Sequence, residues 1–183
     1  MGKKESQSAV AAQVVEAPKV HAKDLKDVLL VAIRIRGEAK KAHWVLKTME
    51  LLRLHKKHHA VLLWATSDVN GMLFKIKDFI AYGTVTKETL VDLLKKKGKL
   101  TGRRPLDEAS MKNLTGYASF EDLADALLKF EVKYADINKQ IVPVFRLHPA
   151  RGGFFKGIKV QSQVGGSLGF YPNGIDKLLE RMV

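Results

Sequence analysis

The stretch with the clearest chemical potential is residues 148–169, HPARGGFFKGIKVQSQVGGSLG, where glycines and basic side chains are interleaved. Six of its residues are glycine, its charges are Arg151, Lys156 and Lys159, and residues 137–175 contain no Asp or Glu. Glycine lets a backbone approach another molecule closely, and Arg and Lys there suit the phosphates of a polyanion. The stretch predicts a phosphate-binding loop, with a flexible, solvated loop as the alternative.

Two further basic segments could contact phosphates. KKKGKLTGRR, residues 95–104, carries six positive charges in ten residues. Part of this run could complement the dipole of a preceding helix, but six charges exceed that need, so we favour a phosphate-contacting segment. The turn HKKHH, residues 55–59, holds three histidines and could suggest zinc. Because the chain has no cysteine and no suitably placed acid, we favour a solvated or phosphate-facing turn without metal.

The sequence shows no recognisable catalytic or cofactor-binding pattern. GKLTG lacks the order of a P-loop, and GGSLG is not a dinucleotide-binding pattern. The histidines have no obvious carboxylate partner in sequence, and the acids gather in a segment that reads as amphipathic. We therefore expect a binding protein that is not an enzyme and uses no cofactor.

The composition points to a polyanionic partner. The 183 residues carry a net charge of +13 and are 46% hydrophobic, which is typical of a folded protein. Such a charge favours nucleic acid or an anionic membrane surface. No apolar run approaches the roughly 18–20 residues that span a bilayer, and no strongly amphipathic basic helix with an exposed apolar face is evident. Nucleic acid is the preferred partner.

The first half of the chain predicts a β-α-β-α-β unit over residues 28–86. Alternation predicts a strand at 28–37 that buries Leu29, Val31, Ile33 and Ile35 on one face and turns Arg34 and Arg36 to the other. We expect helices at 39–54 and 72–80, strands at 60–66 and 80–85, a turn at 67–71, and helices covering one face of the sheet. Trp44 could stack on a base or be partly covered by another element, which we favour.

The second half predicts a helical insert and a return to the sheet. Thr86 is expected to cap a helix at 87–97. Residues 107–136 carry a local charge of −4, against +17 for the rest, and Ser119 with Asp122 predicts a capping box. A strand at 142–149, one hairpin arm near 158–160 and a docked helix at 175–182 follow. We divide the chain into a mobile basic tail (1–25), a core with its basic loop (26–104), an acidic insert (105–140) and a C-terminal unit (141–183).

A series of motifs runs through residues 28–183. They are VAIRIRG (31–37), LLRLHKKHHAVLL (51–63), NGMLFKIKDFIAYG (70–83), LKKKGKL (94–100), YASFEDLADAL (117–127), PARGGF (149–154), GGSLG (165–169) and the closing Ile175, Leu178, Leu179 and Met182. The series resembles the archaeal and eukaryotic form of the large-subunit ribosomal protein family L-thirty, called L-seven in eukaryotes. Ala150 departs from it, since the family often has a second proline there.

The resemblance implies an α+β, ferredoxin-like fold and a cytoplasmic, structural constituent of the large ribosomal subunit. Its implied partners are large-subunit (23S-type) rRNA and neighbouring ribosomal proteins, with no membrane and no small-molecule substrate. Basic positions in matched motifs are the implied rRNA contacts: Arg34, Arg36, Arg53, Lys75, Arg146, Arg151, Lys156 and Lys159. Charge pattern adds Lys40, Lys47, Arg103 and Arg104, and Lys56 and Lys57 rank below these. The alternative is a free RNA-processing or assembly factor.

Overall fold

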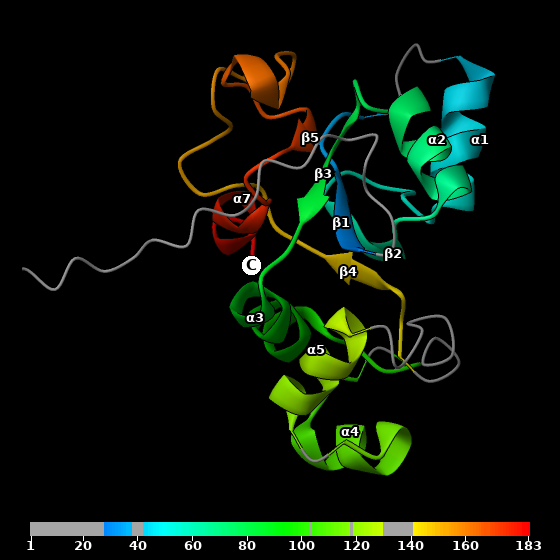
Figure 1. The fold of residues 1–183 in the computed structure, drawn as a ribbon, viewed down its shortest axis with the longest axis vertical. Coiled ribbons are helices and arrows are strands. Elements are labelled where there is room, and N and C mark those ends of the chain that lie inside the picture. The colour runs from blue at the N-terminus through cyan, green and yellow to red at the C-terminus, as the bar shows by residue number, and fades with distance from the viewer. Residues whose placement is uncertain (1–27, 38–41, 103, 118, 130–140) are drawn as a thin grey trace, which may run out of the picture.

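The computed structural model describes residues 28–37, 42–102, 104–117, 119–129 and 141–183 (Figure 1). The tail predicted at 1–25 lies outside these residues. The described part is an α+β fold built on a five-stranded mixed sheet, ordered β4-β2-β1-β3-β5. The strands are β1 (Leu29–Arg34), β2 (His59–Trp64), β3 (Ile80–Thr84), β4 (Val144–Arg146) and β5 (Gly169–Tyr171).

The β-α-β-α-β unit forms the centre of this sheet. β1 lies between β2 and β3 and runs antiparallel to both. β4 adds antiparallel to β2 at one edge, and β5 adds parallel to β3 at the other. The C-terminal quarter of the chain therefore supplies both edge strands, so the core predicted from residues 28–86 is completed by segments far away in sequence.

Both faces of the sheet are covered, and the two helices of the β-α-β-α-β unit lie on the same face, as predicted. Leu30 and Ala32 of β1 pack with α1 (His43–Leu51) and α2 (Ser67–Lys75). Val31 packs on the opposite face with α3 (Lys87–Lys97), α5 (Phe120–Leu128) and α7 (Asp176–Glu180). The predicted alternation is confirmed, because Leu29, Val31, Ile33 and Ile35 share one apolar cluster, and the helices on that face come from beyond residue 86. Arg34, expected on the polar side, is buried.

The second helix begins earlier than predicted. Residues 67–71, expected to be a turn, form the first part of α2 because the hydroxyl of Thr66 accepts a hydrogen bond from the amide of Val69, at 3.3 Å. Asp68 adds a negative charge to the first turn, where the helix dipole favours it. A cap and one acid thus outweigh the turn-forming residues Asn70 and Gly71.

The acidic segment contains α4 (Glu108–Thr115) and α5, which lie toward one end of the molecule, away from α1 and α2 (Figure 1). The predicted capping box is confirmed, since the side chains of Ser119 and Asp122 each accept a hydrogen bond from the other residue's amide. Phe120, Leu123 and Leu127 are buried. Lys87 of α3 pairs with Asp125 at 2.6 Å.

The predicted closing helix is confirmed in its packing: Ile175, Leu178, Leu179 and Met182 are all buried. Its first residue, Asp176, also accepts hydrogen bonds from the amide (2.9 Å) and the hydroxyl (3.0 Å) of Thr86. Thr86 stands at the start of α3 as predicted but makes no side-chain cap of its own. The carboxylate of Asp176 thus binds the residue that precedes α3, which joins α7 to α3.

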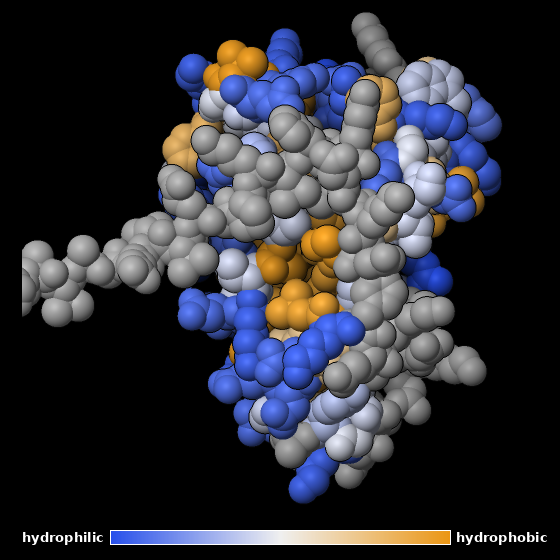
Figure 2. Space-filling view, viewed as in Figure 1, coloured by the Kyte–Doolittle hydropathy of each residue, from blue (hydrophilic) through white to orange (hydrophobic). Residues whose placement is uncertain are grey.

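Figure 2 shows hydrophilic side chains over most of the described surface in this view, with apolar ones gathered in a hollow near its middle. This distribution fits a central sheet with two apolar clusters, one on each face. Charged side chains are carried by the helices and connecting loops around it.

The predicted hairpin near residues 158–160 is absent from the described chain. Residues 148–168 form turns and bends that contain a one-turn 3₁₀ helix, η1 (Ser162–Val164). A single parallel bridge, Gln161 to Leu168, precedes β5. Positive φ angles at Lys156, Gly157 and Gly165 interrupt the extended backbone that a hairpin needs. We call residues 148–169 the glycine-rich arm.

Gly166 is the tightest point of this arm. A Cβ there would lie 2.1 Å from the carbonyl oxygen of Val160. We expect Gly166→Ala to lower the free energy of unfolding by about 1–3 kcal/mol because the backbone must shift in a packed region. Gly71→Ala, in α2, has open space around its Cβ and should stabilise by about 0.5–1 kcal/mol. Chemical denaturation of both variants checks this, and equal effects would contradict it.

Candidate nucleic-acid interface

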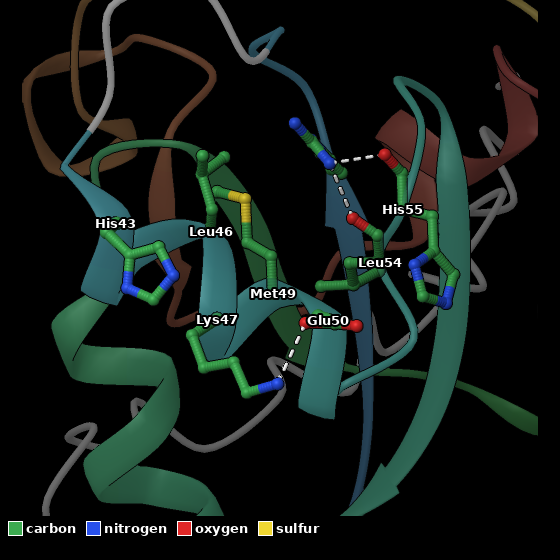
Figure 3. A pocket seen from close by; sticks show the side chains of 8 residues that line it. His43, Leu46, Lys47, Met49, Glu50, Leu54 and His55 are labelled. Atoms are coloured by element: carbon green, nitrogen blue, oxygen red, sulfur yellow. Dashed lines mark hydrogen bonds and ion pairs between the residues drawn. The ribbon is translucent and has the colours of Figure 1, made fainter.

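A buried arginine organises the basic segment between α1 and β2. Arg34, at the end of β1, is only 2% exposed. Its guanidinium donates hydrogen bonds to the carbonyls of Leu54 (2.7 Å) and His55 and to that of Arg36 (3.1 Å), and Figure 3 shows the first two. These carbonyl dipoles compensate the buried charge. The same contacts hold the chain where it leaves α1 and enters the turn.

Residues 55–59, which we call the basic turn, are thereby fixed against the end of β1. The amide of His58 donates to the carbonyl of Arg34 at 2.7 Å, and His58 has a positive φ of 62°. The side chains of Lys56 and Lys57 are exposed, and the alkyl part of Lys57 packs over Gly37. The turn therefore presents two lysines to solvent from a backbone held by hydrogen bonds.

β4 extends this charge along the sheet edge. Arg146 is the register partner of His59 and is exposed. Burial lowers the pKa of His59, and the positive charge of Arg146 lowers it further. His59 is therefore more readily neutral than an ordinary histidine, and Lys56 and Arg146 carry the positive charge on either side of it.

The basic turn and the glycine-rich arm meet through an aromatic contact. His58 stacks on Phe154 with ring centroids 6.2 Å apart and planes 8° from parallel. The amide of Leu147 donates to the carbonyl of His58 at 3.0 Å. Burial lowers the pKa of His58, with Lys57 and His148 as further causes. Two segments about ninety residues apart in sequence are thus held side by side, and each carries exposed cations.

The arm itself is held from the C-terminal end of the chain. Arg181 donates from Nε and a terminal nitrogen to the carbonyl of Arg151, at 2.9 and 2.7 Å, and also to that of Gly153. Its guanidinium lies 4.5 Å from the centroid of the Phe155 ring. Lys156 donates to the carbonyl of Val164 at 3.2 Å. The arm is therefore ordered by the protein's own contacts, unlike the flexible loop that the sequence left open.

The structure separates the predicted contact residues into three groups. Arg146, Arg151, Lys156 and Lys159 are exposed on β4 and the arm. Arg53, Lys75, Lys47 and Arg104 are also exposed but lie on other elements, and Lys47 pairs with Glu50 at 3.1 Å. Arg34 is buried, and Arg36 is half-buried over the ring of Phe79. Lys40 and Arg103 lie outside the described residues.

A cavity of about 260 Å³ lies between α1 and the basic turn, lined among others by Arg34, His43, Lys47, Glu50 and His55 (Figure 3). The carboxylate of Glu50 at this cavity opposes a phosphate there. No group of three metal-ligating side chains occurs among the described residues. The cavity therefore does not extend the basic surface.

Trp44 is 56% exposed, so the sequence-based preference for a covered ring was wrong. Trp44 lies off the buried face of α1, which is formed by Val45 and Met49. Lys56 and Lys57, which rank below the other candidates in the sequence, are exposed in the basic turn next to β4. Sequence reasoning missed Arg181, since a basic residue near a chain end carries no pattern that predicts its contacts.

Comparison with known proteins gives the family. The family model described as "Ribosomal protein L30p/L7e" matches residues 30–80. A protein of Methanoculleus marisnigri named "Large ribosomal subunit protein uL30" is 41% identical over 84% of this chain and 99% of its own length. Proteins of the same name from Hyperthermus butylicus and Thermoplasma volcanium are 42% and 39% identical over 86% and 85% of the chain, and 92% and 93% of their own.

The chain belongs to the L30p/L7e family of ribosomal proteins. This confirms the resemblance seen in the sequence and the expectation of a protein that is not an enzyme, since the family is one of structural ribosomal components. Among the described residues, no helix has the length and apolar character that crossing a bilayer requires.

The role of Arg34 can be tested by removing its guanidinium. Arg34→Met keeps the alkyl chain but leaves the carbonyls of Leu54 and His55 without this donor. We expect the free energy of unfolding to fall by about 2–4 kcal/mol, because buried acceptors lose their partners. Arg53→Met, at an exposed site in the same segment, should change it by less than about 0.5 kcal/mol. Urea unfolding compares them, and similar losses would refute the role of Arg34.

The two shifted histidines predict a pH dependence. The pKa of His58 and that of His59 are both lowered in the folded chain, so the unfolded chain binds more protons below about pH 6.5. Stability should therefore be unaffected by these groups above that pH and should fall as the pH drops through and below it. His58→Gln with His59→Gln should flatten the decline between about pH 7 and 5, measured by thermal unfolding. An unchanged slope would exclude them as the source.

Proposed function

We propose that this chain is a structural constituent of the large ribosomal subunit that binds large-subunit rRNA through phosphate and shape contacts. In this role it supports translation and subunit assembly in the cytoplasm. The observation that carries the proposal is the junction of the basic turn with β4 and the glycine-rich arm in a chain of net charge +13. The names of its relatives as large-subunit proteins support it.

The chemistry of this surface suits an A-form RNA helix. Lys56, Lys57, Arg146 and Arg151 are exposed cations, and they stand on backbone segments fixed by Arg34 and Arg181. A-form RNA hides its base edges in a deep groove and is recognised mainly through phosphates and ribose hydroxyls. A rigid array of cations matches that requirement, because little conformational entropy is lost on binding.

The acidic segment fits a different neighbour. α5 begins with Glu121 and Asp122, and α4 and α5 lie away from α1 and α2 along the molecule (Figure 1). A polyanion would be repelled there. We therefore assign α4 and α5 to solvent or to neighbouring ribosomal proteins. The basic turn, β4 and the glycine-rich arm are assigned to rRNA.

Binding to purified large-subunit rRNA tests the proposal. For roughly six to ten phosphate contacts, the affinity should fall about 10³–10⁵-fold between 50 and 200 mM salt. In lysate, the chain should sediment with large subunits in stoichiometric amount. A flat salt response would refute RNA binding, and recovery only in light fractions would favour the free RNA-processing factor.

The basic turn provides a sharper test. Lys56→Ala with Lys57→Ala should weaken rRNA binding roughly 10- to 100-fold at 100 mM salt and reduce the salt slope by about two. The matched control is Lys112→Ala with Lys129→Ala, which removes the same charge from exposed positions on α4 and at the end of α5. Equal weakening by both variants would show that net charge alone matters.

A further inference from the structure

A second cavity, of about 250 Å³, lies apart from the basic turn, between the end of α2 and η1. Its walls come from Phe74 and Lys77 on one side and from Gln161 and Gln163 on the other, and β3 and β5 contribute Tyr82 and Phe170. β5 pairs with β3 at the sheet edge, as Figure 1 shows. None of the lining residues, all within the described part of the chain, is acidic.

One wall is an exposed aromatic ring with a cation beside it. Phe74 is 60% exposed although it stands on a helix that packs on the sheet. The ammonium of Lys77 lies 4.3 Å from the centroid of its ring. Exposed aromatic rings in cavities mark sites where a partner supplies the missing contact area. An aromatic ring next to a cation suits a planar, electron-rich group attached to a phosphate.

The facing wall is polar and preorganised. The amide nitrogen of Gln161 donates to the carboxylate of Asp78 at 3.1 Å, and Gln163 is exposed. The amide of Ser162 donates to the carbonyl of Leu168 at 2.6 Å, and its hydroxyl donates to that of Phe170. η1 is therefore held against β5. A glutamine amide offers both donors and an acceptor, which can pair with the edge of a base.

The charges around the cavity are positive on balance. Lys77 stands at the α2 side, and the ammonium of Lys156 lies at η1, 3.2 Å from the carbonyl of Val164. Asp78 adjoins the cavity through Gln161, and the guanidinium of Arg36 donates to the backbone carbonyl of Asp78 at 3.1 Å. Lys77 in the lining and Lys156 beside η1 thus outnumber the one carboxylate next to the cavity, which favours a phosphate at the rim.

We propose that this cavity receives one unpaired nucleotide of the bound RNA, with its base against Phe74, its edge toward Gln163 and its phosphate toward Lys77 and Lys156. This inference rests on the proposed rRNA binding. Proteins recognise RNA sequence and loops largely through unpaired bases stacked on aromatic side chains and bound along their edges. A purely apolar partner would strip water from Lys77 and both glutamines without replacing their hydrogen bonds.

The full chain, titrated with large-subunit rRNA in a filter-binding assay, tests the site. Phe74→Ala should weaken binding about 5- to 100-fold, because stacking on one base is lost, and should leave the salt slope unchanged, because no charge is removed. Phe74→Trp should restore most of the affinity. Gln163→Ala should also weaken binding, and Lys77→Ala should reduce the salt slope by about one.

Val164→Ala is the matched control, since Val164 is an apolar residue of η1, 67% exposed, that does not line the cavity. It should bind like the unsubstituted chain, and circular dichroism should show that every variant is folded. If Phe74→Ala binds rRNA as well as the Val164 variant does, the nucleotide site is refuted, and a protein neighbour becomes the better occupant. If the unsubstituted chain itself shows no salt-dependent binding to rRNA, the proposed function is refuted instead.

Discussion

The hydrogen bonds of Arg34 are the interaction on which the shape of the basic surface depends. A guanidinium buried at the end of β1 binds the carbonyls of Leu54 and His55, which come just after α1. A buried charge is tolerated only where polar groups compensate it, so the connection from α1 to β2 has little freedom. The basic turn and β4 follow from that connection, because β4 pairs along β2.

The C-terminal segment, from β5 to Arg181, connects three separate parts of the fold. β5 closes one sheet edge, Asp176 accepts hydrogen bonds at the start of α3, and Arg181 holds the glycine-rich arm. These contacts join residues about thirty to ninety positions apart. The same short segment thus stabilises the sheet, positions the insert through α3 and orders the arm. The position of the cations on the arm and the shape of the cavity at η1 both depend on this segment.

Local patterns predicted the parts of the fold whose causes are local. The strand character of β1, the capping box of Ser119 and Asp122, and the apolar spacing of the closing helix all involve neighbours within a few residues, and the structure contains each of them. The early start of α2 was missed because Thr66 competes with turn-forming residues. The hairpin near 158–160 was predicted wrongly because positive φ angles at Lys156 and Gly157 were not visible in the pattern.

By itself, the sequence determined the family, the order of strands and helices in the core, the absence of thiol chemistry and the excess of positive charge. Only the tertiary structure decided which cations face outward. Arg34 and Arg146 are the same residue type and were both expected to contact rRNA, yet one is buried and the other is exposed. The reason is that a side chain's environment is set by whatever packs against it, and for Arg34 those groups lie about twenty residues away.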